Sequence, residues 1–223
     1  MSTNHGPSIT TNGLSMLLDA ANPKSYIGTG NVWNDISTSR YSFSLQNSPT
    51  YNSSNSGYFT FNGTSQSAQV TGTAAYIPSS GFTAMAWIQP STTASINSII
   101  SHQSGVNTND GWRVTTSTYV RFSLGGVADY VSATAAITTT NWQQIAVTVA
   151  GSSIAFFVNG QKYDTQTVGT LSGTPSTIQI GRDQSSSAEF LNGNLSTAFI
   201  YNRTLSASEI TQNFNAYRGR FGI

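Results

Sequence analysis

Short runs of alternating apolar and polar residues, separated by turn residues, recur along most of the chain and constrain its fold more than any other feature. Residues 58–61 place two phenylalanines on one face and Tyr58 and Thr60 on the other. Residues 82–89 alternate in the same way until Pro90 ends the run. Runs spaced by roughly 8–12 residues are typical of antiparallel sandwiches and argue against alternating strand and helix units. We therefore predict an all-β fold built as a two-sheet antiparallel sandwich.

The pair Asn159-Gly160 gives the clearest local prediction. It separates two strand patterns, residues 153–158 and residues 161–166. Asparagine and glycine tolerate the positive φ that both central positions of a type I′ turn require. We predict a tight β-hairpin at this point.

The end of the sequence departs from the strand pattern and predicts a short helix over about residues 206–218. Ser206 and Glu209 have the S-x-x-E spacing of a capping box. Ile210, Phe214 and Tyr217 then fall on one helical face. A helix of about three turns is marginal alone in water, so this apolar stripe must pack on the sandwich.

Two further features belong to this helix. Gly219 is the expected stop signal. Arg218 and Arg220 lie near the C-terminal end of the helix, where the helix dipole favours cations. Two interpretations stay open for these arginines, namely capping and solubility or contact with an acidic partner surface.

Composition restricts the classes of function. Charged residues make up only 8% of the chain, against roughly 25% in typical soluble domains, and the formal net charge is +1. Nucleic-acid binding through phosphates needs a basic patch, so we expect no such partner. The chain has no cysteine, which excludes disulfides and thiolate zinc sites. Its start lacks a signal-peptide pattern and no apolar run approaches the roughly 20 residues of a membrane span, so we expect cytoplasmic synthesis and no membrane insertion.

We predict a single domain over residues 13–223, including the C-terminal helix, preceded by an N-terminal arm over residues 1–12. Several segments of this domain resemble the laminin-G-like, concanavalin A-like lectin/glucanase jelly rolls. The most specific are "IYNRTLSASEI" and the hairpin "NWQQIAVTVAGSSIAFFVNGQ", together with "YFTFNGTSQSAQV" and "FTAMAWIQP". The resemblance implies two curved sheets packed face to face. Four aromatic residues would then point into the core between the sheets: Trp87, Trp142, Phe157 and Phe199.

The opening and closing segments look like the forms found in tailed-phage structural proteins. This likeness implies a non-enzymatic virion protein, a capsid decoration or a fibre or tail component, which adheres to host surface glycans. Its partners would be other virion proteins and host glycans, its location the virion after synthesis in the host cytoplasm, and its assembly a homo-oligomer such as a trimer. The alternative is a carbohydrate-binding, lectin-like module outside a virion.

The residues needed for catalysis are missing from the sequence pattern. Retaining glycosidases hold two carboxyl groups close together. The two glutamates, Glu189 and Glu209, fall in a predicted loop and in the capping box, and no strand carries acids at alternate positions. His102 ends a strand without a nucleophile motif beside it. We therefore expect no enzymatic activity and no catalytic residues.

We expect no cofactor and no tight metal site. Relatives in the superfamily often bind Ca²⁺ through aspartates, but the matching positions here are Asn62, Gln66 and Ser196. Calcium affinity depends on the number of charged ligands, so neutral side chains give at most a weak site. Asp183 is interpreted as a loop or turn residue.

Glycan binding has one candidate region, because sugars are bound by exposed aromatic rings beside amides and charged groups. The loop and strand around residue 110 and the following hairpin carry such side chains: Asn109, Asp110, Trp112, Arg113, Asp129 and Tyr130. The alternative interpretation is that Trp112 starts a strand and packs inward, after a turn at Asp110-Gly111.

Overall fold

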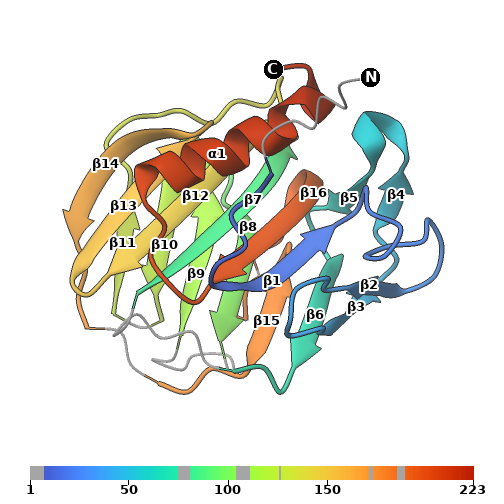
Figure 1. The fold of residues 1–223 in the computed structure, drawn as a ribbon, viewed down its shortest axis with the longest axis horizontal. Coiled ribbons are helices and arrows are strands. Elements are labelled where there is room, and N and C mark those ends of the chain that lie inside the picture. Colours follow the sequence, from blue (N-terminus) through green and yellow to red (C-terminus); the bar gives the residue numbers. More distant parts are fainter. Residues whose placement is uncertain (1–7, 75–80, 104–110, 126, 171–172, 185–188) are drawn as a thin grey trace.

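The computed structural model describes residues 8–74, 81–103, 111–125, 127–170, 173–184 and 189–223. Two antiparallel eight-stranded sheets pack face to face, and one α-helix, α1, is found in this described part of the chain (Figure 1). The predicted all-β jelly-roll sandwich with a single C-terminal helix is therefore confirmed. Asn109 and Asp110 lie outside the described residues.

The first sheet, sheet A, has the order β14-β13-β12-β7-β16-β5-β4, and β1 also pairs with β16. Its strands are β1 (Leu14–Asp19), β4 (Thr50–Asn52), β5 (Tyr58–Asn62), β7 (Phe82–Pro90), β12 (Gln143–Ala150), β13 (Ser153–Val158), β14 (Gln161–Thr167) and β16 (Asn192–Tyr201).

The second sheet, sheet B, has the order β11-β10-β9-β8-β15-β6-β3-β2. Its strands are β2 (Val32–Asn34), β3 (Ser42–Gln46), β6 (Ser67–Thr71), β8 (Asn97–Gln103), β9 (Trp112–Thr116), β10 (Val120–Leu124), β11 (Ala128–Val131) and β15 (Thr177–Ile180). A short 3-10 helix, η1 (Ser54–Ser56), precedes β5, and another, η3 (Arg218–Phe221), follows α1.

The predicted hairpin joins β13 and β14. Asn159 and Gly160 have φ angles of 50° and 76°, the left-handed values that a type I′ turn needs. A Cβ atom at Gly160 would also lie 3.1 Å from Cβ of Phe214 in α1, so glycine lets the turn pass close under the helix. The hairpin prediction is confirmed.

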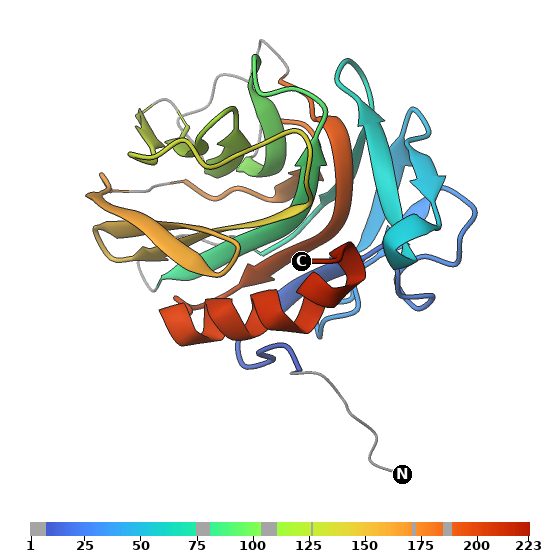
Figure 2. The same cartoon turned by 90° about the horizontal axis from the view of Figure 1, so that it is seen from above.

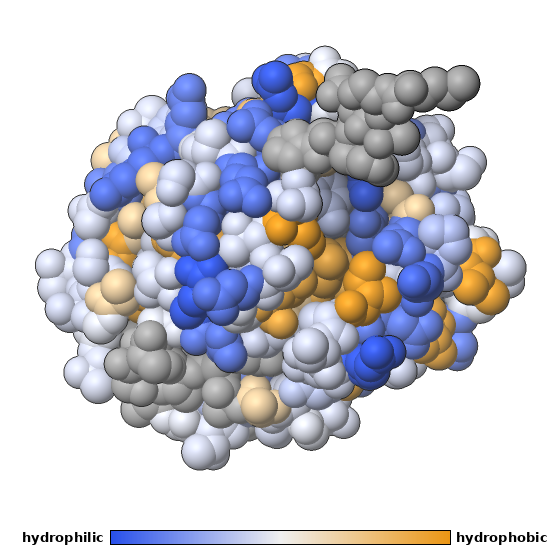
Figure 3. Space-filling view, viewed as in Figure 1, coloured by the Kyte–Doolittle hydropathy of each residue, from blue (hydrophilic) through white to orange (hydrophobic). Residues whose placement is uncertain are grey.

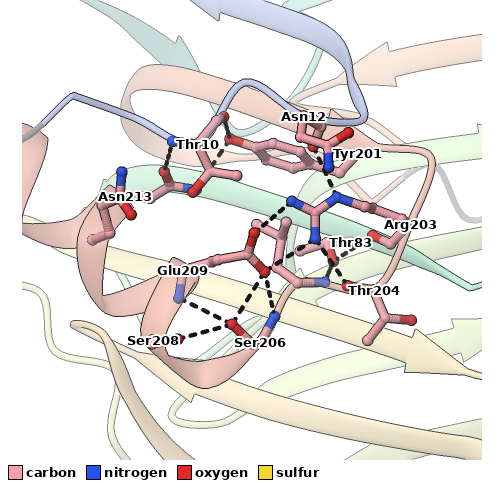
Figure 4. Close-up of polar contacts among 12 residues, drawn as sticks. Thr10, Asn12, Thr83, Tyr201, Arg203, Thr204, Ser206, Ser208, Glu209 and Asn213 are labelled. Carbon is pink, nitrogen blue, oxygen red and sulfur yellow. Dashed lines mark hydrogen bonds and ion pairs between the residues drawn. The ribbon is translucent and has the colours of Figure 1, made fainter.

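Helix α1 (Ala207–Tyr217) begins with the predicted capping box (Figure 4). The Ser206 hydroxyl accepts a hydrogen bond from the Glu209 backbone N–H, and the Glu209 carboxylate accepts one from the Ser206 N–H at 2.9 Å. Arg203 donates to both oxygens of the same carboxylate. The prediction for the stop was wrong, because Gly219 lies inside η3, and the left-handed residue that ends the segment is Gly222, with φ of 71°.

The central strands of sheet A are buried on both faces, which corrects one expectation from the sequence. Trp87, Trp142, Phe157 and Phe199 are buried as predicted, but they do not face sheet B. They form a cluster with α1 residues on the other face of sheet A, called here the helix-side cluster. Figure 2 shows α1 outside sheet A, with sheet B on the opposite side. The alternating strands therefore have two apolar faces, and the helix provides a third layer.

Residues 8–12, which the sequence assigned to an arm, contact this third layer. The Thr10 backbone N–H donates to Asn213 Oδ1 at 2.8 Å, and the Tyr201 hydroxyl donates to the Thr10 carbonyl at 2.9 Å (Figure 4). Gln212 donates to the Ser8 carbonyl at 2.7 Å. Residues 8–10 are thus hydrogen-bonded to helix α1 and to the end of β16.

Candidate functional site

The outer face of sheet B carries a row of polar side chains across neighbouring strands. Trp112, Val114 and Phe122 belong to the core between the sheets, so the residues that alternate with them point outward. Strand register then aligns six outward residues, here called the polar row: Asp129, Ser123, Arg113, Ser101, Gln179 and Gln69. This face of the sheet therefore carries hydroxyls, amides and charged groups. Asp129 is exposed and Gln69 is half-buried, whereas Ser101, Ser123 and Gln179 are buried.

Arg113 is the central charge of the polar row. Its guanidinium forms an ion pair with Asp183, which is fully buried, and lies 3.4 Å from a carboxylate oxygen of Glu189. The other Asp183 oxygen accepts the Glu189 backbone N–H at 3.1 Å. The segment after β15 thus brings two carboxylates to one arginine on β9.

The segment after β15 is held against the sheet by further hydrogen bonds. The Ser101 hydroxyl donates to the Arg182 carbonyl at 2.9 Å, and the Gln184 N–H donates to Gln103 Oε1 at 3.2 Å. The Arg182 guanidinium lies over the Phe190 ring, 5.4 Å from its centroid. These contacts position Asp183 and Glu189 beside the polar row.

Glu189 is the residue of this site with a shifted acidity. Burial raises its pKa above the ordinary value, and the nearby Asp183 charge adds to the increase, while Arg113 opposes it. A half-buried carboxyl of this kind holds its proton more readily than an exposed one.

Several buried polar groups on this face have no hydrogen-bond partner within the described residues. They include the hydroxyls of Thr115 and Ser123 and the Gln179 side-chain oxygen. A buried polar group that lacks a partner costs about 1–3 kcal/mol. Native proteins keep few such groups, so a cluster of them points to a ligand or bound water that completes the hydrogen bonds.

Strand alternation places the predicted glycan-binding residues on opposite faces of sheet B. Arg113 and Asp129 point outward on the polar row, and Asp129 lies 3.2 Å from Arg121. Trp112 is fully buried and stacks on Phe82 with a ring separation of 4.5 Å, so the alternative that it packs inward is correct. Tyr130 packs against the core, and its hydroxyl accepts the Gly169 N–H at 2.7 Å.

The residues of the site that the sequence prediction missed include Asp183, Glu189, Ser123 and Gln179. Ser123 could have been found, because it alternates with core residues in the same hairpin as Arg113. The other three come from segments at least 60 residues away, and their approach depends on the order of strands in sheet B.

The remaining chemistry-bearing positions are engaged within the fold. Both ring nitrogens of His102 contact backbone carbonyls, at 3.0 and 3.1 Å. Asn62 Oδ1 accepts three backbone N–H groups of its own turn, and Gln66 donates to two carbonyls. Ser196 is buried and donates to the Gly57 carbonyl at 2.7 Å. These side chains serve local structure.

Two searches of the described residues complete the description of the site. No group of three or more His, Cys, Asp or Glu residues is arranged to hold a metal ion in the ranges that the structure describes. Within the same ranges, no helix has the length and apolarity required to span a membrane.

The fold and this polar sheet face define a lectin-like jelly-roll domain. Residues 62–211 match the family model described as the concanavalin A-like lectin/glucanases superfamily. The chain belongs to this superfamily. No curated protein sequence matches the chain.

Solved structures support the same fold. The binding domain of Paraclostridial Mosquitocidal Protein 1 has a TM-score of 0.71 and 18% identity, over 92% of this chain and 52% of that chain. Botulinum neurotoxin type C, in a structure concerned with cell entry through two ganglioside molecules, has a TM-score of 0.68 and 17% identity, over 92% and 51%. The binding domain of botulinum neurotoxin DC in complex with SialylT has a TM-score of 0.68 and 17% identity, over 93% and 52%. The chain spans about half the length of these proteins.

Proposed function

We propose that this chain is a non-enzymatic carbohydrate-binding domain and that the polar row on sheet B is its sugar-binding surface. The observation that carries the proposal is the set of buried, unsatisfied polar groups around Arg113, in a member of a lectin/glucanase superfamily. Two toxin chains that share this fold over about half of their length come from structures concerned with gangliosides and SialylT, and this is consistent with the proposal.

The chemistry of the polar row, and of Thr115 beside it on the same face of β9, suits sugar hydroxyls. The Thr115 and Ser123 hydroxyls can both donate and accept, and the Gln179 oxygen accepts. A neutral sugar offers donors and acceptors at every ring hydroxyl, so it satisfies such groups without bringing a charge into the site. The side chains are held in place by strands of one sheet, but Thr115, Ser123 and Gln179 are buried, so a sugar reaches them only when covering residues move aside.

The two carboxylates of the site are poorly placed for glycoside hydrolysis. That reaction needs one carboxyl free to act as nucleophile or base and another to act as acid. Asp183 is fully buried and ion-paired with Arg113, which also contacts Glu189. Their role here is to fix the position of Arg113 rather than to break bonds.

We further propose that the domain works as a component of a phage virion, as a capsid decoration or in a fibre or tail, where it adheres to host glycans. The support is the likeness of the opening and closing segments to phage structural proteins. Antibody labelling of purified virions in the electron microscope tests the location. Absence of the protein from intact particles would contradict the virion role and leave the sugar-binding role standing.

Two substitutions on one strand test the sugar-binding surface. Thr115→Val removes an outward hydroxyl, and Thr116→Val removes a hydroxyl from the next residue, which points to the opposite face; both hydroxyls are buried and unpaired within the described chain. On a glycan array followed by calorimetry, Thr115→Val should weaken binding about three- to tenfold, while Thr116→Val should leave it unchanged. Equal affinities for the two variants, or no glycan bound by the parent protein, would refute the proposal.

A further inference from the structure

The helix side of sheet A contains a second row of buried polar side chains. Register places Gln144 of β12 beside Trp87 of β7, Trp87 beside Thr197 of β16, and Thr197 beside Asp19 of β1. We call these four residues the covered row. Adjacent strands lie about 4.8 Å apart, so the side chains form a continuous line across four strands.

The covered row faces away from sheet B. Each of its members alternates by two positions with residues of the helix-side cluster, in which Trp87 itself lies. The cluster residues two positions from the covered row are Leu17 beside Asp19, Trp142 and Ala146 on either side of Gln144, and Phe199 beside Thr197. In Figure 3, which views this side, apolar side chains gather beside and below α1, over β1 and β16. The row therefore places polar groups within an otherwise apolar, aromatic layer.

Four atoms of the covered row are buried without a hydrogen-bond partner in the described chain. They are both side-chain polar atoms of Gln144, the indole nitrogen of Trp87 and the hydroxyl of Thr197. Together they offer donors, an acceptor and a group that can do both. Apolar residues of similar size would stabilise the layer better, so these groups have a reason other than stability.

The C-terminal segment, residues 218–223, covers two members of this row, Trp87 and Asp19. The Phe221 ring stacks on Trp87, with centroids 4.4 Å apart, and lies 4.6 Å from the Trp142 ring. Arg220 binds both carboxylate oxygens of Asp19, at 2.8 and 2.9 Å. One aromatic ring and one ion pair thus fasten the segment over the four strands.

The segment is a short stretch after the last α-helical turn, held mainly by the side chains of Arg220 and Phe221. Helix α1 ends at Tyr217, and Gly222 and Ile223 are exposed beyond Phe221. Segments with few buried contacts at a chain end open at a small fraction of the global unfolding free energy. Opening residues 218–223 would remove the Phe221 ring from between Trp87 and Trp142, while Phe214 of α1 stays stacked on Trp87 at 5.6 Å and Tyr58 stays against Trp142 at 5.3 Å.

We propose that the covered row is a second binding site, for a hydroxyl-bearing ring such as a pyranose, and that the C-terminal segment is its cover. Phe221 occupies the place where the apolar face of a sugar would stack on Trp87 and Trp142, and Gln144, Thr197 and Asp19 would contact the sugar hydroxyls. This site lies on the opposite side of the sandwich from the polar row and does not depend on it.

The test uses the full-length chain with Phe221→Ala, which removes the stacking ring and leaves the rest of the cover. Glucose, galactose and N-acetylglucosamine serve as probes, and the indole N–H resonance of Trp87 is followed by NMR. We expect at least tenfold tighter binding than in the parent protein. Gln144→Leu added to Phe221→Ala should abolish the gain. Unchanged spectra with all three probes would overturn the proposal and mean that water alone satisfies the row.

Two controls keep this test separate from the sugar-binding surface on sheet B. Thr115→Val combined with Phe221→Ala should keep the gain at Trp87, even if binding at the polar row is lost. If Phe221→Ala disturbs the fold, Arg220→Gln releases the cover from Asp19 and leaves both aromatic rings intact. An Arg220→Gln variant that folds but gives no change at Trp87 with any probe would equally refute the covered site.

Discussion

The two sheets of this molecule use their outer faces in opposite ways. Sheet A packs its outer face under α1 and η3, with two tryptophans and several other aromatic rings in the layer. Sheet B leaves its outer face polar, with serine, threonine, glutamine and a central arginine. Strands of both sheets alternate with a period of two residues. Where the outward residues are apolar, as in sheet A, a third layer covers them, and where they are polar, as in sheet B, the region has two layers.

The largest expected difference between these faces concerns stability. Trp87→Ala removes a fully buried ring from the helix-side cluster and should cost about 3–5 kcal/mol of unfolding free energy. Gln69→Ala, on the polar row, should cost only about 1 kcal/mol, because the side chain is partly exposed and loses one long hydrogen bond, 3.3 Å, from the Gln179 amide. Urea unfolding followed by circular dichroism measures both. Similar losses for the two variants would show that sheet B depends on its outer face as much as sheet A does.

Arg113 is the exception on the polar face. Arg113→Met leaves the buried Asp183 carboxylate without its cation and should cost about 2–3 kcal/mol, less than a fully buried pair because Arg113 keeps some contact with solvent. Arg121→Met breaks the exposed pair with Asp129 and should cost under about 0.5 kcal/mol. Thermal unfolding of the two variants compares them directly. Equal effects would mean that the Asp183 pair is no stronger than a surface pair.

The junction between sheet A and α1 should show a smaller effect. Ser206→Ala removes the N-cap acceptor and should cost about 1 kcal/mol. Ser208→Ala, two residues later, is a matched control whose hydroxyl lies 3.0 Å from the Ser206 hydroxyl. Amide hydrogen exchange of residues 207–217 measures the local stability of the helix. Unchanged protection in Ser206→Ala would indicate that packing alone sets the helix start.

The smallest effect is a pH dependence at the same junction. Arg203 and the Ser206 N–H lower the Glu209 pKa from its ordinary value of 4.5 to about 2. The carboxylate therefore contributes stability above pH 4.5, and this contribution is lost as the pH falls towards 2. The unfolding free energies of the parent and Glu209→Gln should differ at pH 6 and converge near pH 2. A constant difference across this range would exclude Glu209 as the cause.

Sequence reasoning predicted the elements better than their environments. The Asn159-Gly160 turn and the Ser206–Glu209 capping box are local, and both were predicted correctly because each depends on a few adjacent residues. The aromatic residues Trp87 and Phe199 were assigned to the wrong layer, since alternation alone does not say which side of a strand meets the other sheet. The Arg113–Asp183 pair joins residues 70 positions apart and depends on strand order, which the pattern does not encode.

The hydrogen bonds between residues 8–12 and α1 determine from which side this domain can be attached to a larger assembly. The described beginning of the chain and its C-terminal segment both lie on the helix side of sheet A, whereas the polar row lies on the far side of sheet B (Figure 2). A scaffold joined near residue 8 or near residue 223 would therefore contact the domain on the helix side of sheet A. The outer face of sheet B, which we propose as the sugar-binding face, would then point away from the attachment.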